Sequence, residues 1–436
     1  MGELSRAGHR GRCRIGLGRA LTVAVAATAL AAAAGCTNND PPAATGKQGQ
    51  APAGSTAPAP ATPGDVAAAA NALTISPGDG VTNAPVRTPL QVSATDATLD
   101  AVTVVDGAGG RVAGQFTADK RGWKSTGTLK YRTSYTATVT ATDAGGRPVT
   151  RTSKFTTVKP ANLTMPYLRA NADLALSSRK TYGVGQPIVV RFDERIPDRK
   201  AAEKSLKVTT NPPVTGAWHW YTDQQVHWRP QKYWASGTKV SVTADVYGVD
   251  LGRGLYGEQN RSASFTIGEK HVAIADDNTD HIRVFINDKL TRTVPTSMGK
   301  HQTVRNDKGQ TFDLRTRSGA HVVLGTAAVT EMTGASWGLT GAADYKVNSR
   351  FTTRLSYQGE YLHEKRDNVA KHGRQNDSHG CLNLGTNDAR WFMNNFIPGD
   401  VVEVKNTGIQ LAPMDGLTDW NMSWRQWLAG SALGEH

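Results

Sequence analysis

The residues best able to do chemistry lie in one short stretch, Ser378–Asn383, which reads Ser-His-Gly-Cys-Leu-Asn. A cysteine attacks carbonyl groups as a thiolate, and a thiolate needs a nearby base to take its proton. Two histidines could be that base: His379, inside the stretch, and His363, upstream of it. Gly380, beside the thiol of Cys381, lets a substrate come close to the backbone. This combination predicts acyl transfer through a cysteine nucleophile.

The other two of the three cysteines lie near the N-terminus. Residues 1–36 carry five arginines followed by an apolar, alanine-rich run, which is too short to span a bilayer comfortably and is typical of an export signal. The run ends in Ala-Ala-Gly-Cys and resembles a bacterial lipobox. We therefore expect Cys36 to be the lipidated first residue and Cys13 to be removed; an uncleaved anchor is the alternative. An exported chain with one remaining thiol, Cys381, is not a disulfide scaffold.

The chain is basic, with 50 lysines and arginines against 37 aspartates and glutamates, or +13. Without the five signal arginines and Glu3 the balance is 45 against 36, or +9. Because the chain is predicted to be exported, nucleic acid is not expected as a partner. An anionic cell wall and substrates with free carboxylates fit this charge better. A well-solvated basic surface explains it equally well.

The layout suggests several domains. Residues 37–70 carry prolines among Ala, Gly, Ser and Thr, so we expect a disordered linker. From residue 71, Thr- and Val-rich runs separated by glycine turns predict a β-sandwich over 71–158. A weak repeat predicts a second, larger sandwich over 159–268. In it, Trp218 and Trp220 share one strand face, which favours packing in a core or domain interface; a carbohydrate-stacking platform is the alternative.

The region that carries the cysteine starts near Glu269 and is also rich in short β-runs, so the predicted fold class is mainly β. One helix is expected over 386–393, with its N-cap at Thr386 or Asn387. Residues 364–377 are polar and charged without a core-forming pattern, which is typical of an active-site lid. The lysines and arginines of this loop are candidates for binding substrate carboxylates. Histidines elsewhere lack the spacing of metal ligands, so no metal site is expected.

The motif resembles a known family. A histidine, a loop, and then Ser or Thr followed by His-Gly-Cys, an apolar residue and Asn is the signature of the L,D-transpeptidases, and His363 with Ser378–Asn383 matches it throughout. The likeness continues from Ser297–Lys300 to Glu403–Thr407. The tail from Asp415 to Trp427 is similar to the C-terminal subdomain of actinobacterial members.

The resemblance also implies a domain order for this chain. The fold would be mainly β, with two N-terminal immunoglobulin-like sandwiches, a β-rich catalytic domain and a short C-terminal subdomain. The expected segments are a lipoprotein signal (1–36), a linker (37–70), the two sandwiches (71–158 and 159–268), the catalytic domain (269–407) and the subdomain (408–436). The near-helical spacing of Trp420, Trp424 and Trp427 predicts that the tail packs onto the catalytic domain.

The chemistry that the resemblance implies is peptidoglycan cross-linking. Cys381 would attack the carbonyl of the third stem residue, a diaminopimelate, release the terminal D-Ala and remain as a thioester. The side-chain amine of a diaminopimelate on a neighbouring stem would resolve it, giving a 3→3 cross-link. No cofactor or metal is needed, because the energy of the broken peptide bond is kept in the thioester. Carbapenems are expected to bind the same cysteine covalently.

The resemblance also implies roles for single residues. His363 would be the base, oriented by the backbone carbonyl of Glu364. Ser is commoner than Glu at this position in the family, and the added carboxylate would favour the imidazolium form of His363 if it lies close. The backbone N–H groups of Gly380 and Cys381 would form the oxyanion hole. Tyr345 would assist the oxyanion; plain packing is its alternative role.

Three further site residues are expected around the nucleophile. His379 is expected to shape the loop rather than to act as the base. Ser378 and Asn383, with Tyr345, are expected on the substrate side of the site, and Asn383 would hold the nucleophile loop through hydrogen bonds.

Other functions remain open. The same acyl-enzyme could transfer to water or to a protein. Thiol endopeptidases and amidases usually place the cysteine before the histidine, the reverse of this chain. A wall-binding lipoprotein with an inactive domain is the non-catalytic alternative. In the main interpretation the partners are donor and acceptor peptidoglycan stems, and the membrane through the N-terminal lipid. The protein would then sit on the outer face of the cytoplasmic membrane and reach into the wall.

Overall fold

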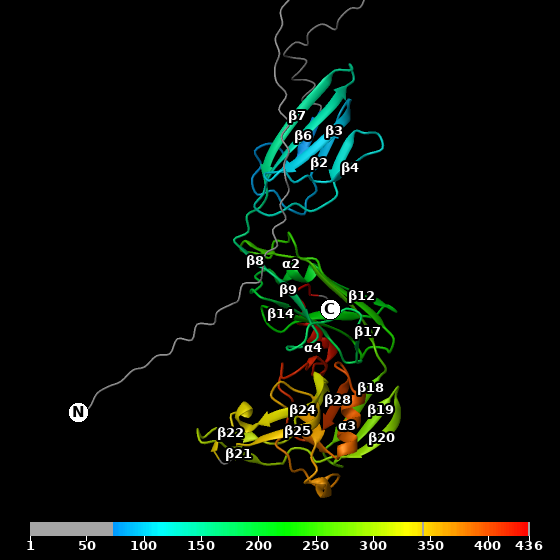
Figure 1. Cartoon of the computed structure of the whole chain (residues 1–436), viewed down its shortest axis with the longest axis vertical. Helices are drawn as coiled ribbons and strands as arrows, with labels where there is room; N and C mark the ends of the chain where they lie inside the picture. The colour runs from blue at the N-terminus through cyan, green and yellow to red at the C-terminus, as the bar shows by residue number, and fades with distance from the viewer. Residues whose placement is uncertain (1–72, 342–343, 435–436) are drawn as a thin grey trace, which may run out of the picture. The chain divides into compact units, whose positions relative to one another are not determined.

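The computed structural model describes residues 73–341 and 344–434 (Figure 1). The predicted signal with Cys13 and Cys36 and the predicted linker over 37–70 lie outside the described residues. The described part is mainly β, as predicted. None of its helices is both long enough and apolar enough to cross a membrane.

The first part of the described chain forms two sheets, with strand orders β1-β2-β5-β4 and β3-β6-β7. Along β6, Tyr135, Ala137 and Val139 are buried and alternate with more exposed residues, so that one face of the strand builds the core. Trp123 and Phe155 belong to the same core. The strands are β1 (Leu73–Ser76), β2 (Gln91–Ala94), β3 (Ala97–Asp106), β4 (Gly114–Phe116), β5 (Gly122–Ser125), β6 (Ser134–Asp143) and β7 (Pro148–Thr156).

The second part forms two four-stranded sheets, β10-β17-β15-β12 and β13-β14-β11-β9, with the small pair β16-β8. Trp218 and Trp220 on β13 are each 7% exposed and lie in the core with Trp228, which confirms the predicted packing. The elements are β8 (Asn162–Thr164), β9 (Pro166–Arg169), β10 (Thr181–Tyr182), β11 (Ile188–Phe192), α2 (Arg199–Lys204), β12 (Leu206–Asn211), β13 (Gly216–Trp220), β14 (Gln225–Pro230), β15 (Lys239–Ala244), β16 (Leu255–Gly257) and β17 (Arg261–Ile267).

The third part carries the cysteine and contains a five-stranded sheet, β20-β19-β18-β28-β23, and a four-stranded sheet, β24-β25-β26-β27. The core of this part includes Leu362, Leu382, Phe392 and Phe396. The strands are β18 (His271–Asp276), β19 (His281–Ile286), β20 (Lys289–Pro295), β21 (Thr303–Arg305), β22 (Thr311–Asp313), β23 (Gly319–Val322), β24 (Gly325–Thr333), β25 (Lys346–Arg354), β26 (Tyr361–Glu364), β27 (Leu382–Leu384) and β28 (Val401–Lys405).

The helices of this part are short. The helix expected after the nucleophile is α3 (Thr386–Asn395), and its N-cap is Gly385. The predicted N-cap at Thr386 or Asn387 was therefore wrong. The helix already includes Thr386, so the residue at the cap is a glycine and no side chain caps the helix. The others are η1 (Gly334–Trp337), η3 (Val369–Lys371), η4 (Asp419–Asn421) and α4 (Trp424–Leu428).

The tryptophan spacing predicted that the C-terminal segment packs onto the part that carries the cysteine, but the segment also packs onto the second part. Trp427 is fully buried against the second sandwich: its Nε1 donates to the carbonyl of Ala217 at 2.9 Å, and its ring stacks on His219 with centroids 4.7 Å apart. The guanidinium of Arg229 lies 4.5 Å from the centre of the Trp427 ring. Asn421 bonds the backbone of Ala320 on β23 instead. The segment therefore contacts both neighbouring parts, because spacing sets which side chains share a face but not what that face meets.

Replacing Trp427 with alanine should lower the free energy of unfolding by about 3–5 kcal/mol, because a fully buried indole and its hydrogen bond are lost. Thermal and chemical unfolding of the full chain measure this loss. Trp424 offers a matched control, since it is only partly buried on the same helix, and Trp424→Ala should cost less than half as much. Equal losses in the two variants would contradict this packing.

Candidate active site

The two residues expected to carry the chemistry are held by neighbouring strands. β26 and β27 pair in parallel, with Leu362 opposite Leu382 and His363 opposite Asn383. The two leucines are fully buried in the core. Because strand side chains alternate, His363 and Asn383 lie on the other face, and Cys381, which directly precedes β27, follows the same alternation. The sheet register thus brings the predicted base and nucleophile to one face.

This face opens onto a cleft of about 640 Å³. The cleft is lined by predicted site residues and by side chains of β24 and β25, such as Met332, Ser349 and Arg350, which the sequence patterns did not single out. Among the lid residues, Lys365, Arg366 and Lys371 line it. The predicted site residues that line the cleft are Tyr345, His363, Glu364, Ser378, His379, Cys381 and Asn383.

His363 is 7% exposed and is oriented as the motif predicts. Its Nδ1 lies 2.9 Å from the backbone carbonyl of Glu364, so we assign the ring proton to Nδ1, which leaves Nε2 to accept a proton. Burial lowers the pKa of His363 below its ordinary value, although the carbonyl and carboxylate of Glu364 both act to raise it. The carboxylate therefore acts in the predicted direction, but burial outweighs it and the resting imidazole is neutral.

The thiol of Cys381 is buried as well, with 8% of the residue exposed. Its Sγ donates to the carbonyl of Gly359 at 3.6 Å. Burial raises the pKa of Cys381 to about 12, while the backbone N–H of Tyr361 acts to lower it. The resting site therefore holds a thiol and a neutral imidazole. Such a resting pair differs from a preformed thiolate–imidazolium ion pair.

The nucleophile loop is closed by its own hydrogen bonds. The hydroxyl of Ser378 donates to the carbonyl of Cys381 at 2.6 Å and accepts the N–H of Gly380 at 3.0 Å. The carbonyl of Gly380 accepts the hydroxyl of Thr316 at 2.9 Å, a contact with no signal in the motif. Gly380 has a φ of +125°, which favours glycine. Its N–H would have to leave Ser378 to serve the expected oxyanion hole, and Gly380 is not among the residues that line the cleft.

Asn383 supports the loop through its backbone. Its N–H donates to the carbonyl of Ser297 at 2.9 Å, and its carbonyl accepts the Ser297 N–H at 3.2 Å and the Thr296 hydroxyl at 3.0 Å. The expectation that hydrogen bonds of Asn383 hold the loop therefore has a structural basis in its main chain, while its side chain faces the cleft.

Tyr345 and His379 form one wall of the cleft, with ring centroids 5.1 Å apart. Burial, together with the nearby Cys381, raises the pKa of Tyr345 to about 12, so its hydroxyl stays protonated and can donate a hydrogen bond. Burial lowers the pKa of His379. This ring contact agrees with the loop-shaping role expected of His379.

The loop over 364–377 is tied down at its C-terminal half. Asp377 pairs with Lys371 at 2.5 Å and with Lys300 at 3.2 Å. The side chain of Asn376 donates to Asp277 at 2.7 Å and accepts the N–H of Met298 at 2.6 Å. The N-terminal half carries Lys365 and Arg366, two of the cationic side chains that line the cleft. Within residues 73–341 and 344–434, no group of three His, Cys, Asp or Glu residues is placed to hold a metal ion.

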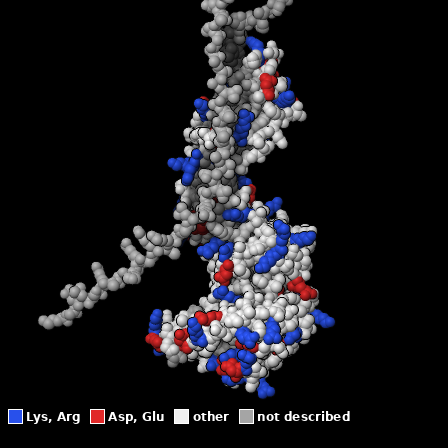
Figure 2. Space-filling view, in the orientation of Figure 1, with Lys and Arg blue, Asp and Glu red and all other residues white. Residues whose placement is uncertain are grey.

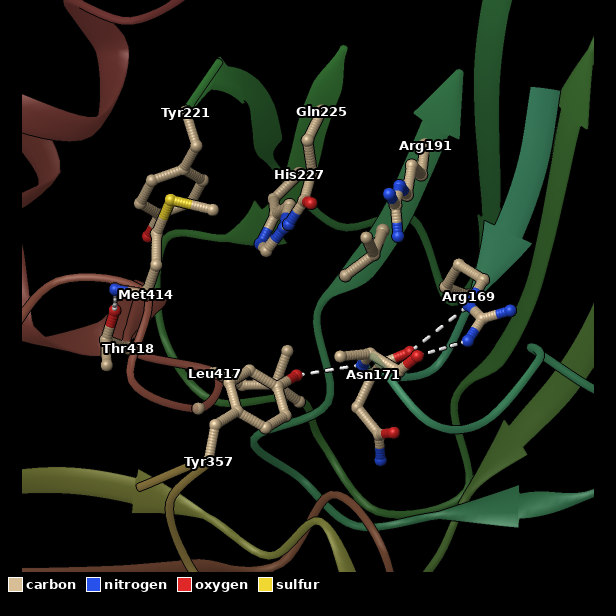
Figure 3. A pocket seen from close by; sticks show the side chains of 13 residues that line it. Arg169, Asn171, Arg191, Tyr221, Gln225, His227, Tyr357, Met414, Leu417 and Thr418 are labelled. Carbon is tan, nitrogen blue, oxygen red and sulfur yellow. Dashed lines mark hydrogen bonds between the residues drawn. The ribbon is translucent and has the colours of Figure 1, made fainter. Parts of the chain in front are cut away.

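A second cavity, of about 230 Å³, lies elsewhere (Figure 3). Its lining includes Arg169 and Arg191 of the second sandwich, Tyr357, and Met414 of the C-terminal segment. Beside it, His227 pairs with Asp419 at 2.7 Å. No cysteine lines this cavity, so the cleft around Cys381 is the candidate active site.

Comparison with known proteins places this geometry in a family. The L,D-transpeptidase catalytic domain matches residues 270–404, and the bacterial Ig domain matches residues 81–250. The chain is 41% identical to L,D-transpeptidase 2 of Mycobacterium tuberculosis (strain CDC 1551 / Oshkosh) over 363 residues, or 83% of this chain and 85% of that protein. It is 34% identical over 367 residues to L,D-transpeptidase 5 of Mycobacterium tuberculosis (strain ATCC 25618 / H37Rv), or 83% of this chain and 77% of that protein. The chain belongs to the L,D-transpeptidase family.

This L,D-transpeptidase is therefore a peptidoglycan transpeptidase, a cysteine acyltransferase that works outside the cytoplasm. A solved structure of the L,D-transpeptidase LdtMt1 in complex with imipenem is also similar, at 25% identity, with 55% of this chain and 99% of that chain covered and a TM-score of 0.45.

Replacing Glu364 with serine should move the acidic limb of the acylation rate to lower pH. The wild-type limb should lie below pH 6.5, because burial holds the pKa of His363 below that ordinary value and the neutral ring is the form expected to act as the base. Loss of the Glu364 carboxylate removes a group that raises this pKa, so a further shift of about 0.3–1 unit is expected. The measurement is the rate of carbapenem acylation against pH, with exposed Glu331→Ser as the control. A limb that does not move, or moves upward, would refute this role for Glu364.

Proposed function

We propose that this L,D-transpeptidase forms 3→3 cross-links through a thioester on Cys381, with His363 as the general base. The observation that supports this most directly is the shared face of β26 and β27, where the buried thiol and the carbonyl-oriented imidazole line one cleft. The neutral resting pair matches a reaction in which the substrate itself triggers proton transfer.

The proposed reaction has two steps, acylation of Cys381 and transfer of the acyl group to the acceptor amine. The Cys381 thiol gives its proton to Nε2 of His363 as the sulfur attacks the diaminopimelate carbonyl of the donor stem. The protonated His363 then gives that proton to the leaving D-Ala amine, and the thioester remains. An amine of the acceptor stem attacks the thioester and passes its proton to His363, and the departing thiolate recovers that proton. The hydroxyl of Tyr345 and the N–H of Cys381 are the proposed donors to the oxyanion of each tetrahedral intermediate, and the N–H of Gly380 would join them once it leaves the Ser378 hydroxyl.

The charges of the cleft suit such a substrate. Arg350, Lys365 and Arg366 line the cleft. Each pairs with a carboxylate of the chain, Glu364 or Asp367, and a free carboxylate of a stem peptide would take the place of that partner. On the face drawn in Figure 2, cationic and anionic side chains are interspersed rather than gathered into one basic field. Recognition of the anionic stem is therefore assigned to the cleft.

The domain boundaries and the anchor belong to the same proposal. The sandwiches over 71–158 and 159–268 would act as spacers, and a lipid on Cys36 would hold the chain at the outer face of the cytoplasmic membrane. The linker over 37–70 would let the catalytic domain, over 269–407 with the subdomain over 408–436, reach the wall. Donor and acceptor peptidoglycan stems are the proposed partners, with no nucleic acid and no cofactor.

Incubation with purified disaccharide-tetrapeptide, followed by mass analysis, should give a dimer that has lost one D-Ala. Fragmentation should place the new bond between two diaminopimelates. Cys381→Ala should give no product and no covalent carbapenem adduct, while wild type gives both. A tripeptide without dimer would favour water as the acceptor. No adduct and no product on wild type would favour a non-catalytic wall-binding protein.

A further inference from the structure

A buried acid–base pair that the proposed reaction does not use is built on Glu360, the residue between Gly359 and Tyr361, whose backbones act on the Cys381 sulfur. His321 on β23 is 0% exposed, and its Nε2 is 3.0 Å from Oε2 of Glu360, which is 1% exposed. Oε1 of Glu360 accepts the backbone N–H of Arg317 at 2.8 Å. Nδ1 of His321 lies 3.1 Å from the carbonyl of Gly319. Both carboxylate oxygens and both ring nitrogens therefore have partners.

The partners of His321 let us assign the protons of the pair. Nδ1 faces a carbonyl, which only accepts hydrogen bonds, so Nδ1 carries a proton. Nε2 faces the carboxylate of Glu360, and a bond between them requires a second proton, on one atom or the other. The pair therefore holds a proton between Nε2 and Oε2 and is neutral as a unit. A buried carboxylate without such a proton or partner would be strongly disfavoured.

Glu360 is also the middle residue of the segment that holds the sulfur. On one side, the carbonyl of Gly359 accepts the S–H of Cys381 at 3.6 Å. On the other side, the N–H of Tyr361 acts on the sulfur and lowers the pKa of Cys381, whereas the charge of Glu360 raises it. The N–H of Glu360 itself donates to the hydroxyl of Ser356 at 3.2 Å. The side chain of Glu360 thus links the backbone around the thiol to β23.

We propose that the Glu360–His321 pair is a positioning element for the nucleophile. The pair fixes Gly359 and Tyr361 around the Cys381 sulfur and places no net charge next to that sulfur. This inference rests on the proposed role of Cys381. A lone carboxylate at this place would oppose the thiolate, because like charges repel strongly where water is excluded. The shared proton of His321 removes that opposition at the moment when negative charge forms on sulfur.

Other groups around the sulfur do not supply this neutralisation. Tyr345 and Tyr361 both have a pKa raised by burial and by Cys381, so neither phenol offers a positive charge. His363 is neutral at rest and must itself receive the thiol proton. The guanidinium of Arg317 is turned to the carbonyls of Arg315 and Asp313, and only its backbone N–H reaches Glu360.

The test is the pH dependence of Cys381 alkylation by iodoacetamide, measured on the whole mature chain. This reagent reports the thiolate and needs no peptidoglycan, so the result is independent of whether cross-linking is the true reaction. His321→Gln keeps a donor near the Nε2 position but cannot carry the extra proton. It should raise the midpoint of the rate profile by at least about 0.5 unit, or slow alkylation at least ~3-fold at a fixed pH below the midpoint.

The double variant His321→Gln/Glu360→Gln decides between charge and simple packing. Because it also removes the carboxylate, its midpoint should return to within ~0.2 unit of wild type. Glu360→Gln alone keeps the shape and should leave the midpoint at or below wild type. An unmoved midpoint in His321→Gln, or a raised midpoint that persists in the double variant or appears in Glu360→Gln, would overturn the proposal.

Two controls keep the readout interpretable. Cys381→Ala shows how much alkylation arises elsewhere, and exposed Glu194→Gln, on the second sandwich, shows the effect of losing a carboxylate at a distance. Melting temperatures identify any variant that does not fold. If His321→Gln proves unfolded, the midpoint of Glu360→Gln decides: at or below wild type it supports the pair, and above wild type it refutes it.

Discussion

The parallel register between β26 and β27 is the constraint on which the site depends. It matches Leu362 with Leu382 and His363 with Asn383, and the leucines are wholly buried. A slip of one residue in either strand would exchange the two faces. A leucine would then enter the cleft, and the imidazole or the thiol would enter the core without its partner. The same apolar burial that stabilises the domain therefore aligns His363, the proposed base, with Cys381, the proposed nucleophile, and a strongly favoured core makes the alignment hard to lose.

Burial has a second consequence, for reactivity. Cys381 has a pKa raised to about 12 and His363 a pKa below its ordinary value, both chiefly through burial. Oxidation and alkylation need the thiolate. A thiol kept neutral until a substrate carbonyl arrives is therefore protected in an oxidising space, where a permanently ionised cysteine would be consumed. The site gives up ground-state nucleophilicity, and the N–H of Tyr361, which acts to lower the pKa of Cys381, favours the thiolate as it forms.

Local chemistry was predictable from the sequence, and long-range contacts were not. The pattern of His363 and Ser378–Asn383 identified the cleft, and strand alternation placed Trp218 in a core, because both depend on spacing within one segment. The bond from Ser378 to the N–H of Gly380 depends on how the loop closes, which residue types do not fix. The pairing of Glu360 with His321 and the docking of Trp427 join distant segments, and no periodicity states which distant segment a given face will meet.

The C-terminal segment shows how such distant contacts meet at the nucleophile. Its Trp427 is bound to β13 of the second sandwich, and the side chain of its Asn421 bonds both backbone groups of Ala320 on β23. The next residue of β23 is His321, which holds Glu360. A side chain on Gly319 would collide with Asn421, so this junction leaves little room for movement. The backbone around the sulfur is thus held by β23 through His321, and β23 is in turn held by Asn421 of the C-terminal segment. The short tail is therefore part of the support of the catalytic site, and the second sandwich supplies the surface on which that tail is anchored.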